Sequence, residues 1–144
     1  MLKKSSGNMY PWVTHTKSFL RGECPHKCSY CYVQAMAKRF PNMASRYTGD
    51  IAPDEAELRE PLGSGRTIFI EHLNDLFANE VHPVLISRVI NYCTAWNNRY
   101  VFQSKNPGRF LQFYGRMFPD TILGTSIESN RHYPEIMGMA PHPK

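Results

Sequence analysis

Short runs of β-branched and aromatic residues alternate along this chain with segments of helical pattern, and this alternation limits the folds available to it. Four runs have the composition of strands, namely 13–19, 67–71, 100–104 and 121–127. Three segments between them have helical character, namely 32–40, 83–96 and 107–118. Strands separated by helical segments of this length favour βαβ units. The sequence therefore predicts an α/β fold with a parallel sheet.

The helical segments also predict which side chains face the core. In segment 83–96 the expected apolar face consists of Leu85, Val89, Tyr92, Cys93 and Trp96. In segment 107–118 it consists of Phe110, Leu111, Tyr114 and Met117. Segment 41–65 is rich in Pro, Gly and acids, so we expect a long connection there, with a short helix over 54–60.

Length and composition indicate one globular domain over residues 1–144, because 42% of the residues are hydrophobic and 20% are charged. No apolar run approaches the ~18 residues of a membrane span. The N-terminus has two lysines without an apolar stretch behind them, which argues against a secretory signal. We expect a cytoplasmic protein without a membrane partner.

Charge is distributed unevenly along the chain. Residues 1–46 carry eight Lys or Arg and a single acid, Glu23, whereas residues 50–80 carry eight acids. The basic part is suited to a polyanion such as nucleic acid, or it forms a solvated face, or it balances an anionic cofactor.

Three of the four cysteines lie within eight residues, at Cys24, Cys28 and Cys31. Clustered thiols in a chain without a secretion signal indicate metal ligands or redox groups. Three thiolates can hold three corners of a [4Fe–4S] cluster and leave the fourth iron open to substrate. The alternative is zinc, which requires a fourth donor. His26 lies inside the loop, where its reach to such a metal is strained, and Cys93 is expected to be a core thiol.

The loop resembles the radical SAM signature, Cys-x3-Cys-x-aromatic-Cys, with Tyr30 in the aromatic position. Three later segments resemble the branch that includes spore photoproduct lyase and an uncharacterised phage-associated group. They are 74–77 (Asn-Asp-Leu-Phe), 103–107 (Gln-Ser-Lys-Asn-Pro) and 124–129 (Gly-Thr-Ser-Ile-Glu-Ser). The resemblance covers nearly the whole chain.

The resemblance implies that the three cysteines hold the cluster and that its open iron binds the methionine part of S-adenosylmethionine (SAM). Tyr30 would lie beside the adenine. The family's Gly-Gly-Glu motif is absent, and Glu71 and Asn74-Asp75 stand in its place, so we expect Asp75 to bind the amine. Lys105 would bind the carboxylate, and Ser126 and Glu128 the ribose hydroxyls.

The implied activity is reductive cleavage of SAM to a 5′-deoxyadenosyl radical, which abstracts hydrogen from a substrate, with nucleic acid as one candidate. An external donor of flavodoxin or ferredoxin type would supply the electron. The alternative function is a zinc-binding structural or nucleic-acid-binding module. The implied fold is a partial (β/α) barrel of radical SAM type, truncated after about four strands. Such a sheet would have an open edge, so we expect the chain to be oligomeric or poorly soluble and weakly active.

Overall fold

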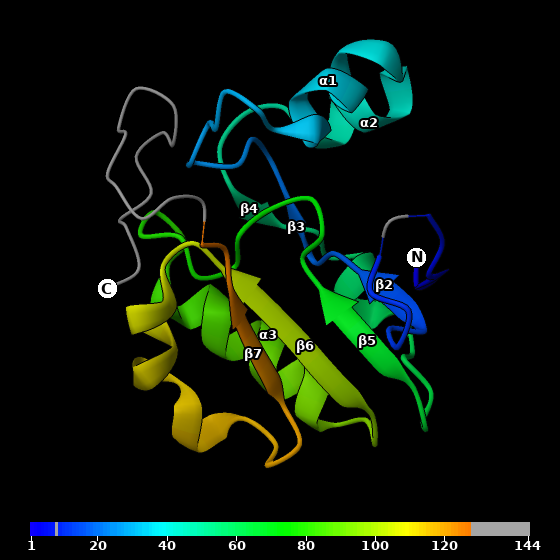
Figure 1. The fold of residues 1–144 in the computed structure, drawn as a ribbon, viewed down its shortest axis with the longest axis vertical. Coiled ribbons are helices and arrows are strands. Elements are labelled where there is room, and N and C mark those ends of the chain that lie inside the picture. The colour runs from blue at the N-terminus through cyan, green and yellow to red at the C-terminus, as the bar shows by residue number, and fades with distance from the viewer. Residues whose placement is uncertain (8, 128–144) are drawn as a thin grey trace.

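Four parallel strands form the centre of the structure, a computed structural model that describes residues 1–7 and 9–127. The sheet has the order β1-β2-β5-β6-β7 (Figure 1). Its strands are β1 (Lys3–Lys4), β2 (His15–Lys17), β5 (Thr67–Ile70), β6 (Arg99–Ser104) and β7 (Ile122–Thr125). Only β1 runs antiparallel to its neighbour. The predicted α/β class with a parallel sheet is confirmed, and the described residues form an open sheet, without a closed barrel.

Successive residues of the inner strands bury their side chains on opposite faces of the sheet. On one face, Ile68, Ile70 and Phe102 belong to the main core together with helix α3 (Pro83–Thr94), which lies behind the sheet in Figure 1. On the other face, Phe69 and Val101 form a small cluster with Val13. The strands are therefore buried on both faces, which explains why they lack an alternation of apolar and polar residues.

The helix predicted over 83–96 is confirmed as α3, with a shifted buried face. Its fully buried residues are Ile86, Val89, Ile90 and Cys93. Leu85, Tyr92 and Trp96 are half-buried and pack against the edge of this core. Cys93 is a core thiol, as expected, and burial raises its pKa.

The single helix predicted over 107–118 is wrong. Two short 3-10 helices occupy the segment, η2 (Pro107–Gln112) and η3 (Tyr114–Arg116). Gly108 and Gly115 weaken an α-helix there, and the tighter 3-10 form is common in short pieces. The change alters which residues are buried, because Phe110 and Phe113 enter the core while Leu111 and Tyr114 are exposed.

The segment between β2 and β5 has more structure than predicted. Helix α1 (Tyr32–Arg39) is confirmed, and α2 (Pro41–Arg46) follows it directly. A small two-stranded sheet joins β3 (Leu20–Arg21) to β4 (Ala52–Pro53), and the 3-10 helix η1 (Glu57–Arg59) replaces the short helix expected over 54–60. In Figure 1, α1 and α2 lie beyond the carboxyl ends of β5 and β6. In the part of the chain that the structure describes, no helix is long and apolar enough to cross a membrane.

Candidate functional site

The carboxyl ends of the parallel strands and the cysteine loop enclose one cavity of about 290 Å³. Cys24, Cys28 and Cys31 all line it. The strand ends contribute Glu71, Asn74, Asp75, Ser104, Lys105 and Ser126 to the same cavity. Six of the residues predicted for the site are therefore brought together here: the three cysteines, Asp75, Lys105 and Ser126. Ligands of open α/β sheets bind at this edge in general.

The cysteine loop folds as two consecutive turns, in which Lys27 N–H donates to Cys24 O at 3.3 Å and Cys31 N–H donates to Cys28 O at 3.0 Å. Lys27 adopts a left-handed conformation with φ 45° between them. Cys28 is buried, whereas Cys24 and Cys31 are half-buried. Cys31 then begins α1 as its N-cap residue. These turns place all three thiols on the same cavity.

A buried histidine ties this loop to the ends of β5 and β6. His26 Nε2 lies 2.7 Å from Asp75 Oδ2, and both side chains are buried. The same carboxylate oxygen accepts from Ser104 Oγ and from Lys105 N, each at 2.9 Å. Asp75 Oδ1 accepts from Phe77 N at 2.9 Å. Protein groups thus occupy both oxygens of Asp75, and its carboxylate holds the cysteine loop against the sheet.

Two other acceptors at this edge have no partner among the described residues. Glu71 Oε1 accepts from the backbone N–H groups of Phe19 and Leu20, but its Oε2 is buried without a hydrogen bond. Asn74 donates from Nδ2 to Gly22 O at 3.4 Å, and its Oδ1 is likewise buried without a partner. Buried acceptors without partners are rare in folded proteins and call for an explanation.

Burial dominates the ionisation of Glu71. It raises the pKa of this carboxyl to about 8, against the two backbone N–H groups, which favour the ionised form. Glu71 also has a left-handed backbone, with φ 62°. The sequence analysis expects Asp75, and not Glu71, to bind the ligand amine. The position of Glu71 could have identified it, because an acid directly after the apolar strand Thr67–Ile70 is placed at the buried end of that strand.

The thiol of Cys24 is also shifted by burial, which raises its pKa to about 12. A metal that binds this thiol must therefore displace a proton. Among the described residues, no group of three or more His, Cys, Asp or Glu side chains is arranged to hold one metal ion. A structural zinc ion needs four donors that converge on a point. Three thiolates of a cubic cluster each bind a different iron, so they need not converge.

Tyr30 and Lys105 meet at the surface of the loop. Lys105 Nζ lies 4.9 Å from the centre of the Tyr30 ring and also donates to its hydroxyl. Burial lowers the pKa of Lys105, while the neighbouring thiols of Cys28 and Cys24 act in the opposite direction. Tyr30 is exposed and does not line the cavity. Ser126 Oγ accepts from Gln103 Nε2 at 3.1 Å, and Glu128 lies outside the described residues.

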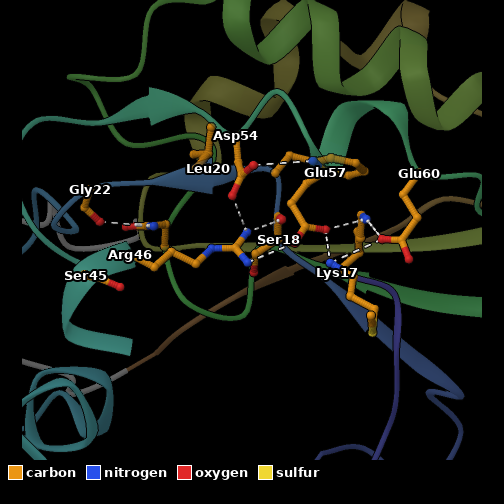
Figure 2. A network of polar contacts seen from close by, with 12 residues as sticks. Lys17, Ser18, Leu20, Gly22, Ser45, Arg46, Asp54, Glu57 and Glu60 are labelled. Atoms are coloured by element: carbon orange, nitrogen blue, oxygen red, sulfur yellow. Dashed lines mark hydrogen bonds and ion pairs between the residues drawn. The ribbon is translucent and has the colours of Figure 1, made fainter. Parts of the chain in front are cut away.

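A second buried polar group connects β2 with α2 and η1 (Figure 2). Lys17 is fully buried, and its Nζ lies 2.6 Å from Glu57 Oε2 and 2.6 Å from Glu60 Oε2. Arg46 pairs with Glu57 at 3.1 Å and donates to Ser18 O at 2.7 Å. Arg46 O accepts from Gly22 N at 2.8 Å, which links this group to the start of the cysteine loop. We call Lys17, Arg46, Glu57 and Glu60 the buried ion network after the fully buried Lys17 at its centre; the other three residues are half-buried.

Fold and site together define an α/β protein with a thiol-lined cavity at the carboxyl edge of a parallel sheet. The chain belongs to the family described as "Protein of unknown function (DUF5131)", whose model matches residues 11–140. Comparisons with curated proteins and with solved structures find no match.

Proposed function

We propose that Cys24, Cys28 and Cys31 hold a [4Fe–4S] cluster and that the cavity binds SAM against its open iron, in a partial barrel of radical SAM type. The observation that carries the proposal is the cavity itself. Three cysteines of the Cys-x3-Cys-x2-Cys loop share it with two buried acceptors that lack a partner among the described residues. Such a cluster would supply one electron for the cleavage of SAM to methionine and a 5′-deoxyadenosyl radical, with an external flavodoxin or ferredoxin as the donor.

Different residues at the site would bind different groups of SAM. Glu71 Oε2 and Asn74 Oδ1 accept hydrogen bonds from the ammonium group of the ligand, in place of Asp75, whose oxygens are occupied. A cation at this position would stabilise the ionised form of Glu71. Lys105 pairs with the ligand carboxylate, and Ser126 reaches the ribose, with Glu128 as the further ribose contact that the resemblance implies. Tyr30 lies beside Lys105, outside the cavity lining, and contacts the part of the adenine that extends beyond the cavity. His26 and Asp75 keep the cysteine loop in place.

The cluster is tested by anaerobic reconstitution of the full chain followed by iron and sulfide analysis. We expect about four irons and four sulfides per chain. Replacement of Cys24, Cys28 or Cys31 by Ala should abolish the cluster. Cys93→Ala is the matched control, because Cys93 is a residue of α3 that faces the main core, so its replacement should not affect iron content. Stoichiometric zinc without sulfide would contradict the proposal and favour the zinc module.

SAM binding is tested on the reduced cluster by electron paramagnetic resonance. We expect SAM to change the spectrum, because it binds the open iron. Glu71→Gln and Lys105→Ala should weaken SAM binding while leaving iron content unchanged. An unchanged spectrum at saturating SAM, with the cluster intact, would exclude this part of the proposal.

A further inference from the structure

A second cavity, of about 640 Å³, opens beside the cysteine cavity on the sheet face opposite α3. The two cavities share five lining residues, Met9, Tyr32, Phe69, His72 and Gln103, so they are continuous. We call this second cavity the N-terminal groove, because β1 and the segment after it form one of its walls. It is large compared with the cysteine cavity, and none of the functions assigned above uses it.

The charged residues of the groove are Lys3 and Lys4, and the described residues of its lining include no carboxylate. Both lysines lie on β1, the edge strand of the sheet, and both are exposed. Their field reaches nearby histidines. Burial is the main cause that lowers the pKa of His72, to about 4, and Lys3 adds to the effect. Burial also lowers the pKa of His15, with Arg66 and Lys4 as further causes. The groove therefore presents a positive potential suited to an anion.

An aromatic platform stands at the same wall. The rings of Tyr10 and Trp12 stack at 5.1 Å with an interplanar angle of 7°. Both side chains remain nearly half exposed, at 44% and 48%. Tyr10 lines the groove, and its hydroxyl donates to Gln103 Oε1 at 3.1 Å, beside the cysteine cavity. Exposed, nearly parallel rings next to lysines are the combination that binds single-stranded nucleic acid, in which phosphates meet cations and bases stack on rings.

We infer that the N-terminal groove binds single-stranded nucleic acid, with its phosphates at Lys3 and Lys4 and a base stacked on the Tyr10–Trp12 platform. A neighbouring nucleotide would then follow the groove to the cysteine cavity. As a statement about the substrate, this inference rests on the proposed function, whereas the binding itself does not require a cluster. Lysines on an edge strand also discourage pairing with other chains, so a role in solubility alone is the competing explanation.

The test is fluorescence anisotropy with labelled 12-nucleotide oligomers and the full chain, with and without the reconstituted cluster. We expect oligo-deoxythymidine to bind about ten-fold more tightly than an abasic oligomer of equal charge, because only the former can stack. It should also bind more tightly than a 12-base-pair duplex. Equal affinity for the thymidine and abasic oligomers, a preference for duplex, or no binding would each overturn the inference.

Variants separate the contact of the lysines with phosphate from the stacking of a base on the Tyr10–Trp12 platform. The Lys3→Ala/Lys4→Ala pair should reduce the slope of log affinity against log salt by about 1.4, or about 0.7 for each lost phosphate contact. The matched control is Lys38→Ala/Arg116→Ala, which removes the same charge at two exposed positions outside the groove lining. If the control pair reduces the slope equally, the contact is diffuse and the inference fails.

Trp12 supplies an independent signal. Trp12→Ala should lose the preference for thymidine over the abasic oligomer. Trp12→Phe should keep most of that preference, because its ring can still stack, but the oligomer should no longer quench the fluorescence of Trp12. Iron content and the SAM-dependent spectrum are measured on the same proteins. An intact, SAM-responsive cluster without oligonucleotide binding would refute this inference alone. Oligonucleotide binding by a chain that forms no cluster would refute the proposed function alone.

Discussion

The half-buried Glu57 and the buried Glu71 have opposite ionisation behaviour, and the contrast separates a carboxylate paired within the protein from one that faces the candidate site. Burial opposes the charge of Glu57, but hydrogen bonds from Lys17 and the N-terminal ammonium outweigh it, so the pKa of Glu57 falls to about 2. Glu71 has no cation bonded to it, and burial raises its pKa to about 8. Both oxygens of Glu57 pair with cations of the buried ion network or the N-terminus, whereas Glu71 keeps one oxygen without a partner among the described residues.

The two carboxylates differ in whether the protein itself supplies a cationic partner. In the buried ion network each carboxylate already has cationic partners within the protein, and removal of Lys17 takes away the buried cation that pairs with both Glu57 and Glu60. The cavity pair of Glu71 and Asn74 is incomplete within the described residues, so a cationic ligand would relieve it. Mutations in the network should therefore reduce stability first, and mutations in the cavity pair should reduce ligand binding first.

The largest effect is expected for Lys17→Met, which removes the cation between Glu57 and Glu60. We expect a loss of about 3 kcal/mol in the free energy of unfolding, measured by urea denaturation, because Glu57 and Glu60 then share only the exposed N-terminal ammonium. The matched control is Arg88→Ala, which breaks the exposed pair of Arg88 with Glu55. Solvent screens that pair, so its loss should have little effect. Equal effects of the two substitutions would show that the buried network contributes no special stability.

Glu71→Gln should have the opposite effect and increase the free energy of unfolding. Below pH 4.5 the carboxyl is protonated in both the folded and the unfolded chain, so it has no pH-dependent effect. Between pH 4.5 and about 8 the unfolded chain releases this proton while the folded chain retains it, so the stability of the wild type falls as pH rises. Glutamine removes this penalty, which at about 1.4 kcal/mol per pKa unit amounts to a few kcal/mol above pH 8.

The measurement is the free energy of unfolding of the cluster-free wild type and the Glu71→Gln variant across pH 4–9. The difference in favour of the variant should grow through this window and then level off. The same variant should bind SAM more weakly once the cluster is reconstituted. A constant stability difference across this pH range would mean that Glu71 is ionised in the folded protein, and its contrast with Glu57 would disappear.

The sequence predicted the four parallel strands from their short runs of β-branched and aromatic residues, and it predicted α3 from its apolar face at helical spacing. It could not predict β1, β3 or β4, which have two residues each and no apolar pattern. The 3-10 form of 107–118 was also missed, because an apolar stripe at helical spacing does not reveal how Gly108 and Gly115 change the winding.

The candidate site shows the same limit. The spacing of Cys24, Cys28 and Cys31 predicted that they share a site, and the resemblance implied that Asp75, Lys105 and Ser126 belong to it; all six line one cavity. The spacing could not reveal that the ring of His26 would contact the carboxylate of Asp75, because that contact joins residues 49 positions apart. The orphaned oxygens of Glu71 and Asn74 depend on the same long-range packing. Which residues line a cavity follows from local pattern, whereas which of them remain available for a ligand follows from the tertiary structure.

The smallest effect is expected for Gly22→Ala, which tests whether the two regions are coupled. Gly22 N donates to Arg46 O of the buried ion network, and Gly22 O accepts from Asn74 of the cavity pair. Its φ of +98° disfavours any side chain, and an added Cβ would lie 2.2 Å from Asp50 O, which belongs to the backbone. Relief of this clash must move the chain on one side or the other.

We therefore expect Gly22→Ala to lose about 1–3 kcal/mol in the free energy of unfolding and also to reduce the iron content after reconstitution. Gly108→Ala is the control, because an added Cβ there has no atom within 4 Å and its φ lies outside the left-handed region. Urea denaturation and iron analysis on the two variants decide the outcome. A Gly22→Ala protein that loses stability but keeps its full iron content would show that the cysteine loop is positioned independently of the buried ion network. In that case the contact between His26 and Asp75 would be sufficient to hold it, because that contact does not pass through Gly22.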